Sequence, residues 1–167
     1  MKMHKFRALA LAISAPAAAA ASAQDVAPAP VARDADYHNR QMLHLYTLRP
    51  SEGWRTTASG LRYREVRDGD GTQRPSATDT VTIHYVGRFI DGTEFDSSVA
   101  RGEPATFPLP RLIRGWQEGV PLMEVGDTYE FAIPYHLAYG AAGRGRIPGG
   151  ATLLFRIELV GIGAAAQ

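Results

Sequence analysis

The sequence predicts an α+β fold in which antiparallel strands wrap around one short helix. Four stretches have the composition of β-strands, a hairpin signal follows the second of them, and only residues 112–120 form a convincing helix in the same region. The strand-like stretches cover residues 61–66, 80–90, 128–133 and 152–160. The 167 residues show no internal repeat and no second domain, so one such fold with extensions accounts for the chain.

The first 23 residues have the pattern of a secretory signal peptide. Three basic residues precede an apolar run over residues 8–15, and an Ala-Ser-Ala sequence ends at Ala23. A membrane anchor is the weaker alternative, because the apolar run is much shorter than the roughly 20 residues of a spanning helix. We therefore expect cleavage after Ala23 and no membrane span in the remaining chain. The periplasm is the expected destination, with secretion as the alternative.

Residues 24–55 form an extension before the strands. Residues 24–33 are mostly alanine, proline and valine, which predicts a flexible leader. Asp34 or Asp36 can then cap a short helix that Pro50 ends. Its apolar positions fall on one face: Met42, Leu45 and Tyr46. A helix this short is marginal alone, so it either packs on its own domain or pairs with a second copy or another protein. Both a monomer and a homodimer therefore stay open.

The strands that follow have the alternation of a half-buried antiparallel sheet. Residues 61–66 alternate between polar and apolar side chains and end at a glycine-marked turn. Residues 80–90 form a longer β-rich run, and the Asp91-Gly92 pair after it is a strong hairpin signal. Phe95 restarts the chain on the other side of that hairpin. The two remaining strands follow the helical stretch.

The composition excludes several kinds of chemistry. The chain has no cysteine, which rules out disulfides, cysteine-ligated metal sites and thiol nucleophiles. Removing the signal peptide takes away three basic and no acidic residues, so the formal charge changes from +1 to −2 and predicts no nucleic-acid binding. There is no Gly-x-Ser-x-Gly elbow, phosphate loop or HExxH pair, and the histidines lack metal-ligand spacing. We expect neither a metal nor a cofactor.

A surplus of aromatic residues in the β region remains to be explained. Taken singly, each is more often a core residue than part of a ligand pocket. Three aromatics stand out because they meet a turn or a polar neighbour: Phe95 in Phe95-Asp96-Ser97-Ser98, Trp116 in Arg114-Gly115-Trp116, and Tyr139 before Gly140. Since loops carry functional sites more often than strands do, these positions are the candidates.

Five sequence blocks, in order, resemble an FKBP-type peptidyl-prolyl cis-trans isomerase. The blocks are Val81-Thr-Ile-His-Tyr-Val-Gly87, Asp91-Gly-Thr-Glu-Phe-Asp-Ser-Ser98, Ile113-Arg-Gly-Trp-Gln-Glu-Gly119, Ala138-Tyr-Gly140 and Ala151-Thr-Leu-Leu-Phe155. The resemblance covers residues 56–162 and leaves 163–167 as a tail. Residues 57–63 are similar to the first strand of exported members with an N-terminal helical extension. The resemblance implies an antiparallel β half-barrel wrapped around one short helix, with an apolar pocket that accepts a proline ring.

The resemblance also implies roles for individual residues. Trp116 would form the floor of the pocket, and the Tyr139 hydroxyl and the Ile113 N–H would bind the substrate. Asp96 would lie at the pocket edge facing the prolyl amide, with Arg101 paired to Asp96 and Tyr85. The walls would be Tyr85, Phe95, Phe107, Leu112, Ile113, Ile147 and Phe155. For Asp96, capping of the turn after the hairpin is the alternative, and for Tyr139 it is packing within its loop.

The implied function is acceleration of X–Pro isomerisation during the folding of exported proteins. The partners would be unfolded or partly folded proline-containing proteins, and macrolide immunosuppressants are family ligands. Two alternatives stay open: a non-catalytic prolyl-peptide-binding chaperone or holdase, and an inert scaffold that docks a partner through the helix at residues 37–48.

The chain departs from the family pattern at the pocket. Ala105 stands where many members carry another aromatic, Arg111 where Glu or Gln is common, and Arg144 where some carry histidine. We expect these differences to alter substrate preference and macrolide affinity more than the fold.

Overall fold

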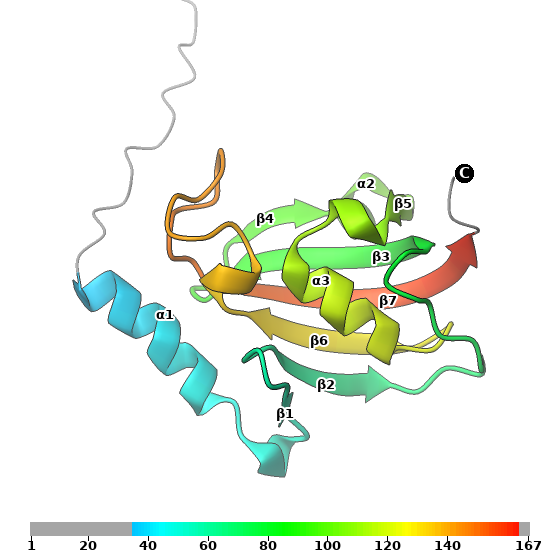
Figure 1. Ribbon diagram of the computed structural model, residues 1–167, viewed down its shortest axis with the longest axis horizontal. Helices are drawn as coiled ribbons and strands as arrows, with labels where there is room; N and C mark the ends of the chain where they lie inside the picture. Colours follow the sequence, from blue (N-terminus) through cyan, green and yellow to red (C-terminus); the bar gives the residue numbers. More distant parts are fainter. Residues whose placement is uncertain (1–34, 164–167) are drawn as a thin grey trace, which may run out of the picture.

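The computed structural model describes residues 35–163, which form a seven-stranded antiparallel sheet with α3 packed against it and α1 beside it (Figure 1). The strands are β1 (Arg55–Thr56), β2 (Arg62–Arg67), β3 (Thr80–Phe89), β4 (Glu94–Ser97), β5 (Ala105–Pro108), β6 (Thr128–Ile133) and β7 (Leu153–Gly163). The α-helices are α1 (Ala35–Thr47), α2 (Ser98–Arg101) and α3 (Arg114–Gly119), and the 3-10 turns are η1 (Pro50–Glu52), η2 (Leu109–Arg111), η3 (Val120–Leu122) and η4 (Tyr135–Leu137). The signal peptide and the leader expected from the sequence lie outside the described residues, as does the tail beyond Gly163.

The sheet has the strand order β1-β2-β6-β7-β3-β4, and β5 pairs with the first half of β3. The longest strands, β3 and β7, pair from Thr80 opposite Gly163 to Phe89 opposite Leu153. The predicted fold class is confirmed. The four predicted strands match β2, β3, β6 and β7 within a few residues at each end.

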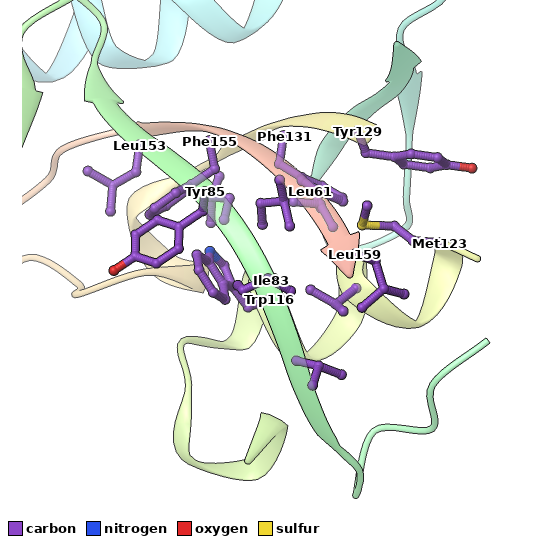
Figure 2. Packing of buried hydrophobic residues seen from close by; sticks show 14 of the residues in the cluster. Leu61, Ile83, Tyr85, Trp116, Met123, Tyr129, Phe131, Leu153, Phe155 and Leu159 are labelled. Atoms are coloured by element: carbon purple, nitrogen blue, oxygen red, sulfur yellow. The ribbon is translucent and has the colours of Figure 1, made fainter. Parts of the chain in front are cut away.

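The central strands bury alternate side chains on the face that α3 covers, which we call the inner face. In β3 this alternation buries Val81, Ile83 and Tyr85, while the residues between them are only partly buried. Figure 2 shows Tyr85, Trp116 and Phe155 grouped at one end of this core, with Met123 and Leu159 at the other. One continuous apolar core therefore supports the whole length of the sheet.

On the opposite face of the sheet, which we call the outer face, lies α1, and the C-terminal half of this helix contacts the sheet. Leu45 of α1 packs with Trp54 and with Ala132, which alternates with the inner residues of β6. Met42 packs against this cluster as well, whereas Tyr46 is 70% exposed and takes no part in it. The described part of α1 thus packs on its own domain. Within residues 35–163, no helix is long and apolar enough to cross a membrane.

Candidate functional site

The floor of the candidate site is Trp116, the central residue of α3. Its indole is 5% exposed and meets Tyr85 and Phe155 edge-on, with ring centroids 5.3 and 5.1 Å away. The Phe107 ring lies 6.3 Å from it at an angle of 72°. Edge-to-face packing of this kind favours a single arrangement of the rings. Three strands thereby hold the indole in place.

Two glycines let α3 lie close enough to β6 to set the depth of this floor. A Cβ atom on Gly115 would lie 2.4 Å from Cγ2 of Ile133, and one on Gly119 would lie 2.6 Å from Cε1 of Phe131. Both separations are too short for real atoms, so any larger residue would push the helix away from the sheet. In the Arg114-Gly115-Trp116 motif, the glycine therefore lets the helix approach the sheet, and the tryptophan places its indole in the pocket.

The helix begins later than the sequence pattern suggests, and the difference creates a part of the site. Leu112 and Ile113 are extended, with ψ of 173° and 149°, and the Gln117 side chain donates a 2.7 Å hydrogen bond to the Leu112 carbonyl. The Ile113 carbonyl accepts from the Trp116 N–H at 2.9 Å. Among the described residues no acceptor is bonded to the Ile113 N–H, which leaves this donor for a ligand.

A polar group lies at the pocket edge, where β3, β4 and α2 meet. The Tyr85 hydroxyl donates to Asp96 Oδ2 at 2.6 Å, and Arg101 donates to Asp96 Oδ1 at 2.6 Å and to the Tyr85 oxygen at 2.9 Å. Burial acts to raise the pKa of Asp96, but the hydrogen bonds from Tyr85 and Arg101 outweigh it and hold this pKa below its usual value. The carboxylate is therefore ionised and fixed in orientation at neutral pH.

The remaining wall comes from the loop between η4 and β7. Tyr139 is half-buried in this loop, and its carbonyl accepts a hydrogen bond from the Gly143 N–H at 3.1 Å. No hydrogen bond among the described residues includes its hydroxyl, although Tyr139 lines the pocket. The hydroxyl is thus free to donate to a ligand carbonyl.

These elements enclose a pocket of about 480 Å³. Nine residues that the sequence analysis singled out line it: Tyr85, Phe95, Asp96, Phe107, Leu112, Ile113, Trp116, Tyr139 and Phe155. Arg101 does not line the pocket and acts on it through Asp96 and Tyr85. Ile147 is not brought to the pocket either; it packs against the core, and its backbone closes a turn with Arg144.

Four further lining residues were not among the sequence-based candidates: Arg111, Arg114, Ala138 and Arg144. Exposed arginines have no pattern that marks them as site residues. The departures from the family pattern at Arg111 and Arg144 were the available signal.

The arrangement combines an apolar floor with a few fixed polar groups around it. Besides the three lining arginines, its donors include the Ile113 N–H, the Tyr139 hydroxyl and the Trp116 indole N–H, which has no partner among the described residues; its one lining carboxylate among them is Asp96. This set fits a compact apolar ring held next to peptide carbonyls.

Comparisons with known proteins all point to the same family. Residues 71–160, more than half of the chain, match the family described as FKBP-type peptidyl-prolyl cis-trans isomerase. The chain is 54% identical over 111 residues to an FKBP-type peptidyl-prolyl cis-trans isomerase FkpA of Aeromonas hydrophila, covering 66% of this chain and 41% of that protein. It is 52% identical over 112 residues to the FKBP-type 22 kDa isomerase of Escherichia coli K12, covering 66% and 54%. The chain thus spans about half the length of these relatives.

Solved structures show the same fold. The crystal structure of FkpA from Escherichia coli matches with a TM-score of 0.75 and 39% identity, covering 79% of this chain and 62% of that one. A peptidyl-prolyl cis-trans isomerase structure from Pseudomonas syringae matches with a TM-score of 0.71 and 30% identity, covering 77% and 96%. At these identities the similarity extends beyond the general fold.

Proposed function

The chain belongs to the FKBP-type peptidyl-prolyl cis-trans isomerase family, and from this premise we propose that its pocket binds prolyl segments of unfolded or partly folded proteins and accelerates their cis-trans isomerisation. The observation that carries the proposal is the aromatic pocket floored by Trp116, with Asp96 fixed at its edge. We place the catalytic domain at residues 56–162, after an extension of residues 24–55. We also propose macrolides as ligands of the same pocket.

The physics of the reaction explains why such a pocket can catalyse it. Rotation about the X–Pro bond crosses a barrier of roughly 18–20 kcal/mol, because twisting removes the amide resonance. The twisted amide has less charge separation than the planar one. Transfer from water to an apolar floor therefore disfavours the planar ground state more than the transition state, and each reduction of about 1.4 kcal/mol speeds exchange tenfold.

The polar groups add orientation to this desolvation. The Ile113 N–H and the Tyr139 hydroxyl can each donate to a peptide carbonyl, which anchors the chain on both sides of the rotating bond. Asp96 keeps its orientation because Tyr85 and Arg101 hold its two oxygens separately. The carboxylate thus presents a fixed negative charge toward the prolyl amide without any bond to the substrate being made or broken.

We also propose that the protein is exported, with residues 1–23 as the signal peptide and the periplasm as its location. The support is the sequence pattern of basic residues, apolar run and small residues before Ala23. Its clients would then be other exported proteins that contain proline.

The proposal is tested by the cis-to-trans exchange rate of a Leu–Pro peptide with wild-type protein and with Asp96→Leu and Tyr139→Phe. We expect clear acceleration by the wild type and a loss of at least about tenfold in Asp96→Leu, which corresponds to about 1.4 kcal/mol. Asp68→Leu and Tyr46→Phe, on exposed residues outside the pocket, serve as matched controls that keep full activity. A folded wild type that binds the peptide without accelerating exchange would identify the protein as a binding module instead.

A further inference from the structure

Three arginines surround the mouth of the pocket. Arg111 ends η2, Arg114 begins α3, and Arg144 lies in the loop between η4 and β7. All three line the pocket, although their side chains are exposed overall. Segments separated in the sequence thus place three positive charges around one opening.

No carboxylate of the described residues neutralises these charges. Asp96 is the one acidic residue that lines the pocket, and its salt bridge at 2.6 Å is with Arg101. Among the described ion pairs, none includes Arg111, Arg114 or Arg144. The charges of Asp96 and Arg101 cancel each other, so the three arginines leave the pocket mouth with an excess of positive charge.

Arginines on the outer face of the sheet are in a different situation. On the outer face of the sheet, Arg64 and Arg156 both lie against Glu130, and Arg67 pairs with Glu158. The whole chain has a formal charge of only +1. Other described arginines also lack an ion pair, among them Arg40, Arg49 and Arg55, but they do not line the pocket. The pocket mouth differs because three such charges surround one opening.

The three arginines lie close to where the neighbours of a bound proline would be. Arg111 and Arg114 flank the extended Leu112–Ile113 segment, whose free N–H at Ile113 would bind a substrate carbonyl. Arg144 approaches from the loop that carries Tyr139. Side chains next to a proline held in the pocket therefore extend toward arginines whose forked donors match a carboxylate.

We propose that this pocket selects prolyl segments with an acidic residue next to the proline, and that Arg111, Arg114 and Arg144 determine this preference. The proposal rests on the prolyl-binding function above and specifies its substrate class. Because the arginines are exposed, the selectivity is several-fold and decreases as salt screens the charges. Attraction at the pocket mouth also raises the association rate of acidic segments.

The experiment uses three peptides, Ala-Glu-Pro-Phe, Ala-Gln-Pro-Phe and Ala-Lys-Pro-Phe, which differ only before the proline. Exchange rates and affinities by calorimetry are measured with three proteins. These are the wild type, the pocket variant Arg111→Gln/Arg114→Gln/Arg144→Gln, and the control Arg40→Gln/Arg49→Gln/Arg55→Gln. The control removes the same total charge from exposed positions that do not line the pocket.

We expect the wild type to prefer Glu over Gln over Lys, with roughly tenfold between Glu and Lys at about 0.05 M salt and much less at about 0.5 M. The pocket variant should bring the three peptides within about twofold of one another, while the control keeps the wild-type ratio. Equal Glu-to-Lys ratios in the wild type and the pocket variant, or a wild-type preference for Lys, would overturn the proposal.

Failure of the proposed function is recognised separately. A wild type that accelerates neither these peptides nor a Leu–Pro peptide is no isomerase, and the affinities of the three peptides then decide the charge preference on their own. If the pocket variant misfolds, the salt dependence of the wild-type Glu-to-Lys ratio gives the answer. A ratio that does not change with salt contradicts the proposal.

Discussion

The two faces of the sheet are built in different ways. The inner face is covered by one continuous apolar core, and the pocket residues Tyr85, Trp116 and Phe155 belong to that core. The outer face is mostly polar, with ion pairs along β2, β6 and β7 and a small apolar cluster of Leu45, Trp54 and Ala132 under α1. The shape of the pocket and the stability of the domain therefore depend on the same residues on the inner face, whereas the outer-face cluster contributes to stability without lining the pocket.

This difference predicts that changes at the pocket cost stability, while changes at α1 leave the pocket intact. A residue that is both core and binding surface cannot be altered for one purpose without affecting the other. The extension, by contrast, is held by contacts of its own, the Leu45–Trp54–Ala132 cluster and the hydrogen bonds between Gln41 and Thr152, and these do not involve the pocket.

We expect the largest effect on stability when the two tryptophans are replaced. Trp116→Ala removes a side chain packed against three rings, and we expect the free energy of unfolding to fall by about 3–5 kcal/mol. Trp54→Ala should cost roughly half as much, because Trp54 packs in the small outer cluster and its ring is covered partly by Arg64, 5.0 Å from the centroid. Urea unfolding of both variants measures the difference.

An equal or larger loss at Trp54 would contradict the distinction between the two faces. If Trp116→Ala does not fold, the milder pair Trp116→Phe and Trp54→Phe makes the same comparison. Peptide binding should be lost in the Trp116 variants and retained in the Trp54 variants.

The parts of the fold that follow local patterns could be predicted from the sequence. The β-rich composition of residues 80–90 and the Asp91-Gly92 pair are properties of neighbouring residues, so they predicted a long strand and a hairpin. The strands β1 and β5 were missed because they have only two and four residues, too few for a periodic pattern to show. Pairing with β3, not local sequence, makes β5 a strand.

The site was predictable where its residues carry recognisable motifs, as at Asp96 and Trp116. The arginines of the pocket mouth were not, because only the tertiary fold brings Arg144 to the same opening as Arg111. Gln41 was missed for a similar reason, since its partner Thr152 is 111 residues away. Ile147, which the resemblance places in the pocket wall, is not among the lining residues; it packs against the same core, and its backbone closes a turn with Arg144.

Gln41 provides an intermediate test, on the attachment of α1. Its side-chain oxygen accepts from the Thr152 N–H at 2.8 Å, and its carbonyl accepts from the Thr152 hydroxyl at 3.1 Å; both residues are buried. Gln41→Leu leaves the Thr152 N–H buried without an acceptor, so we expect a loss of about 1–3 kcal/mol. Amide exchange should become faster in α1 and at Thr152 but not in β3.

The exposed Asn39→Leu on the same helix is the control and should change stability little. Faster exchange throughout β3 in Gln41→Leu would show that α1 is part of the main cooperative unit. That result would remove the separation between the two faces.

The smallest expected effect concerns protonation of Asp96. Its pKa is lowered in the folded protein, so the stability that the ionised form contributes is present above the ordinary aspartate pKa of about 3.9 and is lost as pH falls through the folded value. Tyr85→Phe removes one of the two donors. We expect it to raise the Asp96 pKa and to cost about 1 kcal/mol or less, because the side chains of Asp96 and Arg101 are 45% and 46% exposed.

Carbon NMR titration of the side-chain carboxyl groups measures this shift directly. Asp91 is an internal control, because a backbone hydrogen bond from Thr93 lowers its pKa and Tyr85 has no part in it. We therefore expect the Asp96 midpoint to rise in Tyr85→Phe while the Asp91 midpoint stays in place. An unchanged Asp96 midpoint would mean that Arg101 alone holds the carboxylate, and the pocket edge would then depend on an exposed ion pair instead of on the core residue Tyr85.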